Sequence, residues 1–360
     1  MYKVKVPKCE LFFNSVEDAL KVPIEIVHLV RNKAYTFNKV FNNINYSDFE
    51  LNENSYYLPS QGKQGRFQEH MNDVIDFLRD KDLLNGPIIE IGCGNGNFIE
   101  ELKKRGYSSV IGYDPTYKGE EKNIIKSNFP PNEALPFKPE LIILRHVLEH
   151  IPYPYDFLSM LSKQFSGATN IYIEVPCFDW IVTNKAFFDI TYLHCNYFNA
   201  KCFDIFFSKC EIKHLFDNQY LGVVANTFDL YNSLNLDKNE ECDLIDLENA
   251  EKNVKDIITG FNTKIALWGA SSKGILLANI LDPLNNKIEF LIDIDTNKQN
   301  KYISTSGHKV VSPDSIFNIS ELTIIVVNEN YYKNIQARIN NKTVKLVSIN
   351  ELIEGKTQYD

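Results

Sequence analysis

The sequence lacks several features that would place it in other protein classes. No apolar run approaches the roughly 20 residues that a membrane-spanning helix needs, and the first residues, MYKVKVPKCELFF, contain no signal-peptide core or cleavage site. Lys and Arg form no run, and the net charge of the 360 residues is −9. We therefore expect a cytoplasmic protein that neither inserts into a membrane nor binds a nucleic acid polymer.

Paired CxxC motifs are also missing. The seven cysteines are Cys9, Cys93, Cys177, Cys195, Cys202, Cys210 and Cys242. An odd, scattered set in a cytoplasmic protein is typical of reduced thiols. The sequence therefore predicts neither disulfides nor a structural zinc site.

The chain is too long for one ordinary domain, and strand and helix patterns restart within it. PIIEIGCGNGNFIEELKKRG (87–106) and KIALWGASSKGILLANIL (264–281) each predict a strand, a glycine-containing loop and a helix. This alternation is typical of α/β domains with parallel, doubly wound sheets.

We predict four segments along the chain. They are an N-terminal segment (1–60), a first α/β domain (61–235), a polar helical connector (236–259) and a smaller Rossmann-like α/β domain (260–360).

The first glycine loop, EIGCGNG (90–96), has an acid two residues before its first glycine. Glu90 would repel a pyrophosphate but suits a positively charged ligand. The second strand ends at Asp114, about 20 residues after the loop, where a carboxylate can accept hydrogen bonds from ribose hydroxyls. A generic Rossmann turn that binds NAD, or nothing, is the alternative.

This pattern resembles the S-adenosylmethionine site of class I methyltransferases, and ELIILRHVLEHI (140–151) resembles their fourth strand and the loop after it. The resemblance implies a class I methyltransferase Rossmann-like fold and S-adenosyl-L-methionine as cofactor. The residues that it places around the cofactor are Glu90, Gly92, Cys93, Gly94, Gly96, Asp114, Pro115 and His146.

The second glycine loop, WGASSKG (268–274), can hold a phosphate through its backbone N–H groups and Lys273. With IDIDTNKQNKYISTSGHKVVSP (292–313), it resembles the C-terminal domain of sugar C-methyltransferases, although Asn300 stands where that family has glycine. The resemblance implies that Gly269, Ser271 and Lys273 contribute to binding a nucleotide sugar. A structural turn with a solvated lysine is the alternative.

The N-terminus departs from that family, because its relatives carry a small zinc module built on CxxC pairs and this chain has none. The linker YYLPSQGKQGRFQEH (56–70) still resembles the family's segment over the methionine moiety. The resemblance therefore adds Tyr57 and Ser60 to the expected cofactor site, and an ordinary surface linker is the alternative.

The segment DITYLHCNYF (189–198) resembles the family's Tyr-His-Glu-His-x-x-Tyr-Phe motif, which follows a strand ending in Glu-Val-Pro. His194 matches the family's general base, whereas Thr191 and Leu193 replace its Tyr and Glu. The resemblance also places His150 near the acceptor. The residues that it implies are His194, His150 and Tyr192 for catalysis, with Thr191, Asn196 and Tyr197 around the acceptor. A core histidine bonded to the backbone is the alternative for His194.

Loss of a phenol and a carboxylate that would support an enolate shifts the expected reaction from C-methylation toward O- or N-methylation. A metal ion is not expected. His146 and His150 are four residues apart and can share a helix face, but no third potential ligand lies at a spacing typical of metal sites.

We therefore expect an S-adenosylmethionine-dependent methyltransferase that acts on a nucleotide-linked sugar in surface polysaccharide or glycan biosynthesis, with a homodimer left open. Two alternatives remain: an NAD-dependent sugar oxidoreductase, and a non-catalytic sugar-binding protein with a relic S-adenosylmethionine pocket.

Overall fold

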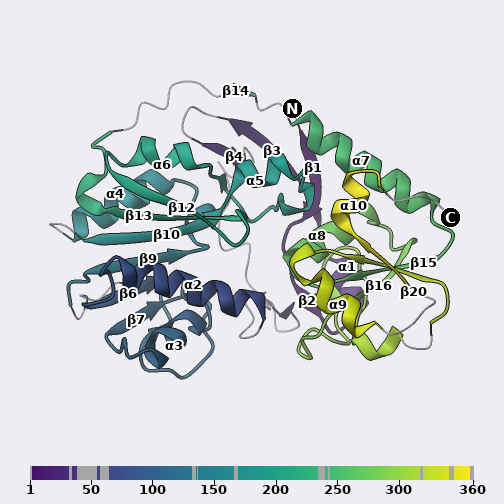
Figure 1. The fold of residues 1–360 in the computed structure, drawn as a ribbon, viewed down its shortest axis with the longest axis horizontal. Helices are drawn as coiled ribbons and strands as arrows, with labels where there is room; N and C mark the ends of the chain where they lie inside the picture. The colour runs from purple at the N-terminus through teal and green to yellow at the C-terminus, as the bar shows by residue number, and fades with distance from the viewer. Residues whose placement is uncertain are drawn as a thin grey trace.

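The computed structural model describes residues 2–31, 35–38, 55–56, 65–131, 135, 137–165, 169–233, 240–241, 244–316, 319–339 and 344–356. Two lobes, one built on a mostly parallel sheet and the other on a parallel sheet, are joined by the N-terminal segment (Figure 1). Tyr57 and Ser60 lie outside the described residues, so their expected role stays a prediction.

The larger sheet has seven strands in the order β12-β13-β10-β9-β6-β7-β8. They are β6 (Ile88–Ile91), β7 (Val110–Tyr113), β8 (Ile124–Ile125), β9 (Leu141–Arg145), β10 (Asn170–Pro176), β12 (Cys210–Leu215) and β13 (Tyr220–Asn226). Among these strands, only β13 runs against its neighbours. The chain order changes direction beside β6, which places a ligand crevice at the carboxyl ends of β6 and β9.

Helices cover this sheet, whose central strands are buried along their whole length as in sheets covered on both faces. The helical elements are α2 (Arg66–Asp80), α3 (Asn97–Lys104), η3 (Leu148–His150), α4 (Pro154–Gln164), α5 (Phe178–Thr183), η4 (Phe187–Asp189), α6 (Ala200–Phe206) and η5 (Thr227–Asp229). Apolar residues at helical spacing, among them Met71, Ile75 and Leu78, form the buried face of α2. The predicted doubly wound class I fold is confirmed.

The smaller sheet has five parallel strands in the order β18-β16-β15-β19-β20. They are β15 (Lys264–Trp268), β16 (Ile288–Ile292), β18 (Val310–Val311), β19 (Leu322–Val326) and β20 (Val344–Ser348). The helical elements are α7 (Ile245–Gly260), α8 (Ser272–Leu281), η6 (Pro313–Ile316), η7 (Glu329–Tyr331), α9 (Tyr332–Arg338) and α10 (Ile349–Ile353). A Cβ at Gly274 would lie 1.8 Å from the Gly269 carbonyl oxygen, so only glycine lets α8 start this close to the end of β15. The predicted second α/β domain is confirmed, and its strand order reverses beside β15.

The N-terminal segment pairs with strands from both lobes. One sheet joins β1 (Lys3–Pro7), β3 (Ile24–Arg31), β4 (Thr36–Asn38), β11 (Asn196–Tyr197) and β14 (Glu240–Glu241). Another joins β2 (Phe12–Phe13), β5 (Ser55–Tyr56) and β17 (Tyr302–Ile303), next to the short helix α1 (Val16–Leu20). In Figure 1, β1 runs between the lobes. One hydrophobic core accordingly contains Val4, Tyr192 and Leu267, from all three parts of the chain.

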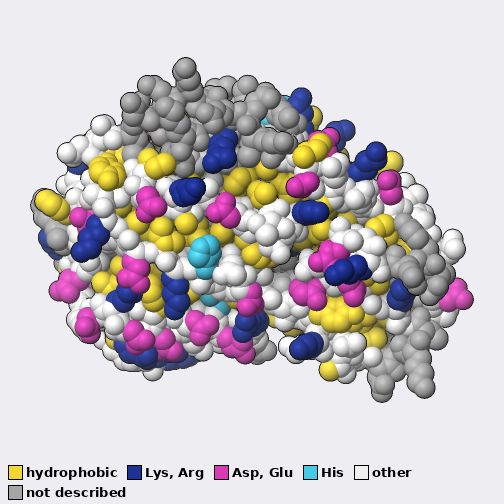
Figure 2. Space-filling view, turned by 45° about the horizontal axis from the view of Figure 1, so that its top comes forward, with side chains coloured by type: hydrophobic (Ala, Val, Ile, Leu, Met, Phe, Trp, Pro, Cys, Tyr) yellow, Lys and Arg dark blue, Asp and Glu magenta, His cyan; other side chains and the backbone are white. Residues whose placement is uncertain are grey.

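The surface carries both signs of charge. On the face shown in Figure 2, Lys and Arg side chains are interspersed with Asp and Glu, and they form no continuous basic patch on its described part. Arg79, for example, pairs with Asp76 and Asp80 on α2. No described helix combines the length and the apolar character that crossing a membrane would require.

A buried carboxylate at the end of β10 ties α2 to the sheet. Glu174 accepts hydrogen bonds from Tyr172 Oη at 2.8 Å and Arg145 Nη2 at 3.1 Å, and its Oε1 lies 3.0 Å from His70 Nε2 and 2.9 Å from His146 Nε2. Burial opposes the negative charge, but Arg145, His70 and His146 outweigh burial and hold the pKa of Glu174 well below its ordinary value. The carboxylate is therefore ionised inside the fold.

Replacing this carboxylate, as in Glu174→Gln, should lower the free energy of unfolding by about 3–5 kcal/mol, because Arg145 loses its buried counter-charge. The depressed pKa means that the contribution of Glu174 is present above the unfolded value of about 4.3 and is lost as pH falls through the folded value. Denaturant unfolding followed by circular dichroism measures both effects. The matched control is Glu211→Gln, which removes an exposed ion pair with Lys81 and should cost less than about 1 kcal/mol. Equal losses in the two variants would contradict this role.

Candidate functional site

A cavity of about 1940 Å³ lies between the two lobes. Its walls come from the carboxyl ends of β6, β7 and β9 in one lobe and of β15, β16 and β19 in the other. The two crevices that the strand orders predict therefore open into one space. Pockets for a single small ligand are commonly about 300–1,000 Å³, so this cavity has room for two.

The first glycine loop forms one end of the cavity. Gly92 and Gly94 have φ of +71° and +55°, and a Cβ on Gly92 would lie 2.4 Å from Val147 Cγ2. Asp114 Oδ2 accepts a hydrogen bond from Gly94 N at 2.9 Å, and Oδ1 accepts from Thr116 N and Oγ1 at 2.8 and 2.7 Å. The loop and the aspartate thus fit the adenosyl group of S-adenosylmethionine, with a carboxylate held where ribose hydroxyls can reach it.

Most of the predicted cofactor residues line the cavity. Those that do are Gly92, Cys93, Gly94, Asp114, Pro115 and His146. Glu90 and Gly96 are not among the described residues of its wall. Glu90 is only 3% exposed, and burial raises its pKa to about 8, although Arg145 acts in the opposite direction. Glu90 is therefore buried behind the described cavity wall, and its expected contact with the cofactor stays a prediction.

The second glycine loop repeats this arrangement at the other end. Asp293 Oδ2 accepts a hydrogen bond from Ala270 N at 2.8 Å, as Asp114 does from Gly94. The predicted residues Gly269, Ser271 and Lys273 line the cavity, and so does Asp293. Asp293 was missed as a site residue, although its place just after β16 was a usable signal.

Lys273 joins the two lobes. Its Nζ donates hydrogen bonds to Asp189 Oδ2 at 2.8 Å and Gln219 Oε1 at 3.1 Å, and it lies 4.9 Å from the centre of the Trp180 ring. All three partners belong to the first lobe. Lys273 is therefore not a solvated surface lysine but a cation at the junction of the lobes.

The segment 189–198 divides its side chains between the cavity and the core. Asp189, Thr191, Leu193 and His194 line the cavity. Tyr192, Asn196 and Tyr197, expected to act on the acceptor, are not among the described cavity residues. Tyr192 is 3% exposed in the hydrophobic core, Asn196 Nδ2 donates to the Ile151 carbonyl at 2.6 Å, and Tyr197 Oη bonds the backbone of Thr191. Residues 192 and 193 form a turn and Asn196 and Tyr197 form β11, so these three side chains pack in the interior and not on the described cavity wall.

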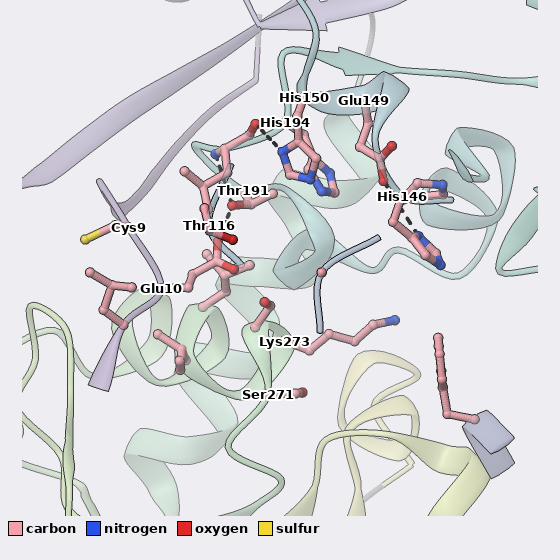
Figure 3. A pocket seen from close by; sticks show the side chains of 18 of the residues that line it. Cys9, Glu10, Thr116, His146, Glu149, His150, Thr191, His194, Ser271 and Lys273 are labelled. Atoms are coloured by element: carbon pink, nitrogen blue, oxygen red, sulfur yellow. Dashed lines mark hydrogen bonds and ion pairs between the residues drawn. The ribbon is translucent and has the colours of Figure 1, made fainter. Parts of the chain in front are cut away.

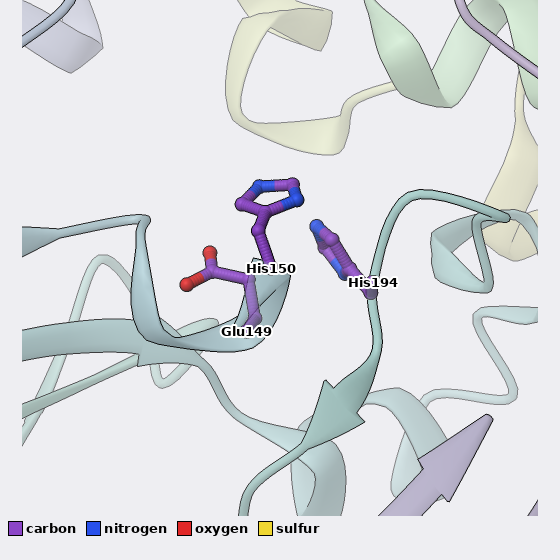
Figure 4. Close-up of side chains that lie close together, drawn as sticks. All are labelled: Glu149, His150 and His194. Atoms are coloured by element: carbon purple, nitrogen blue, oxygen red, sulfur yellow. The ribbon is translucent and has the colours of Figure 1, made fainter. Parts of the chain in front are cut away.

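His150 and His194 face each other across this wall (Figure 4), with ring centroids 4.9 Å apart. His150 Nδ1 lies 2.9 Å from the Leu193 carbonyl oxygen, and a carbonyl can only accept, so Nδ1 carries a proton. His194 Nδ1 is buried and has no hydrogen-bond partner in the described structure. Burial, and then the neighbouring His150, lower the pKa of His194 to about 3. Its imidazole is therefore neutral near pH 7.

Glu149 was missed by the sequence interpretation, although it lies inside the HVLEHI motif. It is 1% exposed, its Oε1 is 3.7 Å from His146 Nδ1, and its buried Oε2 has no hydrogen-bond partner among the described residues. Burial opposes its charge, but His146 and then His150 hold its pKa below the ordinary value. Burial alone would lower the pKa of His146, yet Glu149 and Glu174 raise it to about 9. The result is a buried carboxylate beside a protonated imidazole.

Glu10 enters the same cavity from the N-terminal segment (Figure 3), and no local sequence signal pointed to it. It accepts hydrogen bonds from Thr191 Oγ1 and from the Ser272 side chain, which belong to different lobes. Burial raises its pKa above the ordinary value, although these hydrogen bonds act in the opposite direction. Glu10 thus supplies a carboxyl group to the same wall of the cavity, where Leu193 replaces the glutamate of the resembled family.

Comparisons with known proteins identify the first domain. Residues 64–225 match the family model described as a methyltransferase domain, and residues 261–349 match the one described as C2185-like, N-terminal. The chain is 27% identical over 115 residues to a peramine synthetase of Metarhizium rileyi and 24% identical over 132 residues to one of Metarhizium majus. These stretches cover 27% and 31% of this chain but only 4% and 5% of those proteins.

Two solved structures also match. An S-adenosylmethionine-dependent methyltransferase from Archaeoglobus fulgidus is 19% identical, with a TM-score of 0.34, over 43% of this chain and 94% of that one. The magnesium protoporphyrin IX methyltransferase from Synechocystis, with bound SAH, is 16% identical, with a TM-score of 0.32, over 44% and 82% of the two chains. The sheet order and the matched model define residues 64–225 as a class I, S-adenosylmethionine-dependent methyltransferase domain.

Removing the carboxylate beside the first loop, as in Asp114→Ala, should weaken binding of S-adenosylhomocysteine by about 10–100-fold, because hydrogen bonds to a charged group are lost. Isothermal titration calorimetry measures the affinity. Asp80→Ala, at an exposed aspartate of α2, is the control and should bind like the parent. Unchanged affinity in Asp114→Ala would remove this residue from the cofactor site.

Proposed function

We propose that the protein transfers the methyl group of S-adenosylmethionine to a nucleotide-linked sugar in polysaccharide or glycan biosynthesis. The observation that carries the proposal is the single cavity that joins two aspartate-supported glycine loops, with a histidine pair on its wall between them. One loop suits the donor, and the other suits the nucleotide end of the acceptor.

At the donor end, Asp114 would bind the ribose hydroxyls, and the backbone of Gly92, Cys93 and Gly94 would line the adenosyl group. The cofactor supplies a methyl group made electrophilic by its positive sulfur. The chain's own task is then to hold an acceptor atom in line with that methyl group and to keep the geometry fixed.

At the acceptor end, Asp293 would bind the ribose of the nucleotide, as Asp114 does at the other loop. The backbone N–H groups near Ser271 and the ammonium of Lys273 would face the phosphates. The sugar would then lie between the loops, against Glu10 and the two histidines, which Figure 3 shows on one side of the cavity above Ser271 and Lys273.

A sugar hydroxyl is the acceptor that this wall suits best, since Thr191 stands where the resembled family has the tyrosine that would support an enolate. As the acceptor oxygen takes the methyl group, its proton would move to His194 or to His150. His194 is neutral near pH 7 and therefore has a nitrogen lone pair that can accept this proton. Glu10 would orient the same hydroxyl through its carboxyl group.

His194→Ala should lower turnover by about 10²–10⁴-fold, because the variant removes a positioned proton acceptor. Transfer of a labelled methyl group to candidate nucleotide sugars, followed by mass and NMR assignment of the methylated atom, measures this. His214→Ala, at an exposed histidine of β12, is the control and should keep full turnover. If no nucleotide sugar is methylated, or if NAD binds tightly and S-adenosylmethionine does not, the proposed function is wrong.

Lys273→Ala should raise KM for the nucleotide sugar at least about tenfold, because a charge-assisted hydrogen bond to phosphate is lost. The affinity for S-adenosylhomocysteine should stay the same, since the described contacts of Lys273 are with Asp189, Gln219 and Trp180 and not with the first glycine loop. Steady-state kinetics with the nucleotide sugar and with its free sugar separate the two effects. An equal rise in KM for both sugars would show that Lys273 does not bind the phosphates.

A further inference from the structure

A carboxylate and two imidazoles lie close together on the acceptor side of the cavity, and a proton acceptor alone would not require all three. Glu149, His150 and His194 each offer one ligand atom, and these atoms all lie within 4.8 Å of one another (Figure 4). Two ligands of one ion can be at most about 4.4 Å apart, because each bond is about 2.0–2.2 Å long. Three ligands of a tetrahedral ion lie about 3.3–3.6 Å from one another, so side-chain shifts of roughly an ångström would bring all three onto one ion.

Two atoms of this cluster are buried without a hydrogen-bond partner in the described part of the chain. They are Oε2 of Glu149 and Nδ1 of His194. Buried polar atoms are nearly always paired, and an ionised carboxylate is the most costly to leave unpaired. Both atoms are acceptors or have an acceptor tautomer, so one cation can satisfy them together.

The cluster is also held in place by its surroundings. The carbonyl of Leu193 fixes the tautomer of His150, as second-shell acceptors commonly do for histidine ligands. Cys195 N donates to the Glu149 carbonyl at 2.8 Å, and this bond clamps the segment that carries His194 against η3. His146 Nδ1 lies 3.7 Å from Glu149 Oε1 and orients that carboxylate.

We propose that Glu149, His150 and His194 bind one divalent transition-metal ion whose remaining coordination positions open into the cavity. Two imidazoles and one carboxylate suit borderline ions such as Zn²⁺, Co²⁺, Ni²⁺ and Fe²⁺, whereas Mg²⁺ and Ca²⁺ prefer oxygen ligands. Three protein ligands with open positions are typical of catalytic rather than structural metal sites.

The sequence interpretation expected no metal because it paired His146 with His150 and found no third ligand. The fold instead combines Glu149 and His150, which are adjacent in the chain, with His194, which lies 44 positions after His150. His146 becomes the residue that orients the carboxylate ligand.

This inference rests on the proposed function and changes the way in which the acceptor is activated. A sugar hydroxyl that binds the ion becomes more acidic, as metal-bound water does. Its O–H bond breaks, the proton passes to water in the cavity, and the electron pair stays on the metal-bound oxygen. That oxygen would then bond to the methyl carbon as the carbon–sulfur bond breaks and its electron pair goes to sulfur. The histidines would bind the ion instead of taking the proton.

The test measures metal binding without any sugar. Protein stripped with a chelator is titrated with Co²⁺, whose visible absorption reports ligand type and geometry, and Zn²⁺ is used in competition. We expect one ion per chain and an absorption band typical of a low-coordinate site with nitrogen ligands. Elemental analysis of protein purified without chelator gives an independent count.

Glu149→Gln, His150→Ala and His194→Ala should each weaken Co²⁺ binding by about 10–100-fold or more. His214→Ala should bind like the parent, and each variant should keep its affinity for S-adenosylhomocysteine if it is folded. Absence of stoichiometric binding would overturn the inference, and so would binding that survives the loss of all three ligands.

The two proposals can fail separately. If chelator-treated protein methylates a nucleotide sugar at the full rate and binds no Co²⁺, the metal site is wrong and the histidine base stands. If one Co²⁺ binds through these ligands but no nucleotide sugar is methylated, the metal site stands and the sugar substrate is wrong.

Discussion

The ionised carboxylate of Glu174 is the interaction on which the acceptor side of the site depends. It lies at the end of β10 and holds Arg145 and His146 at the end of β9, together with His70 of α2. His146 has φ of +55°, a backbone conformation that non-glycine residues seldom adopt, and the carboxylate fixes its ring there. His146 in turn lies beside Glu149. The buried charge of Glu174 therefore helps to position the polar side chains of the cavity wall.

The features that could be predicted from the sequence are local ones. Both strand–loop–helix units, at 87–106 and 264–281, are continuous patterns in the sequence. The tight turns between strand and helix require glycine, so the glycines themselves indicate the loops. The positions of Asp114 and Asp293, each just after the second strand of its domain, can be inferred in the same way. The carboxyl ends of neighbouring parallel strands meet at one edge of a sheet. The fold and the cofactor end of the cavity could therefore be predicted from short continuous stretches of the sequence.

The acceptor side could not be predicted in this way, because its groups meet only through long-range packing. Glu10 reaches the cavity from the connection between β1 and β2, and Thr191 and Ser272, which bind it, are about 180 and 260 positions away. In the segment 189–198, the residue types alone did not reveal which side chains face the core. The pairing of β11 with β4 decides it, and that pairing turns Tyr197 inward.

The position of Lys273 links charge in the cavity to the contact between the lobes. An ammonium group has three N–H donors, and Asp189 and Gln219 of the opposite lobe accept two hydrogen bonds from it. An anion that approaches the second loop competes with Asp189 for the same positive charge. A phosphorylated compound bound there would therefore weaken the hydrogen bonds by which Lys273 ties the two lobes together.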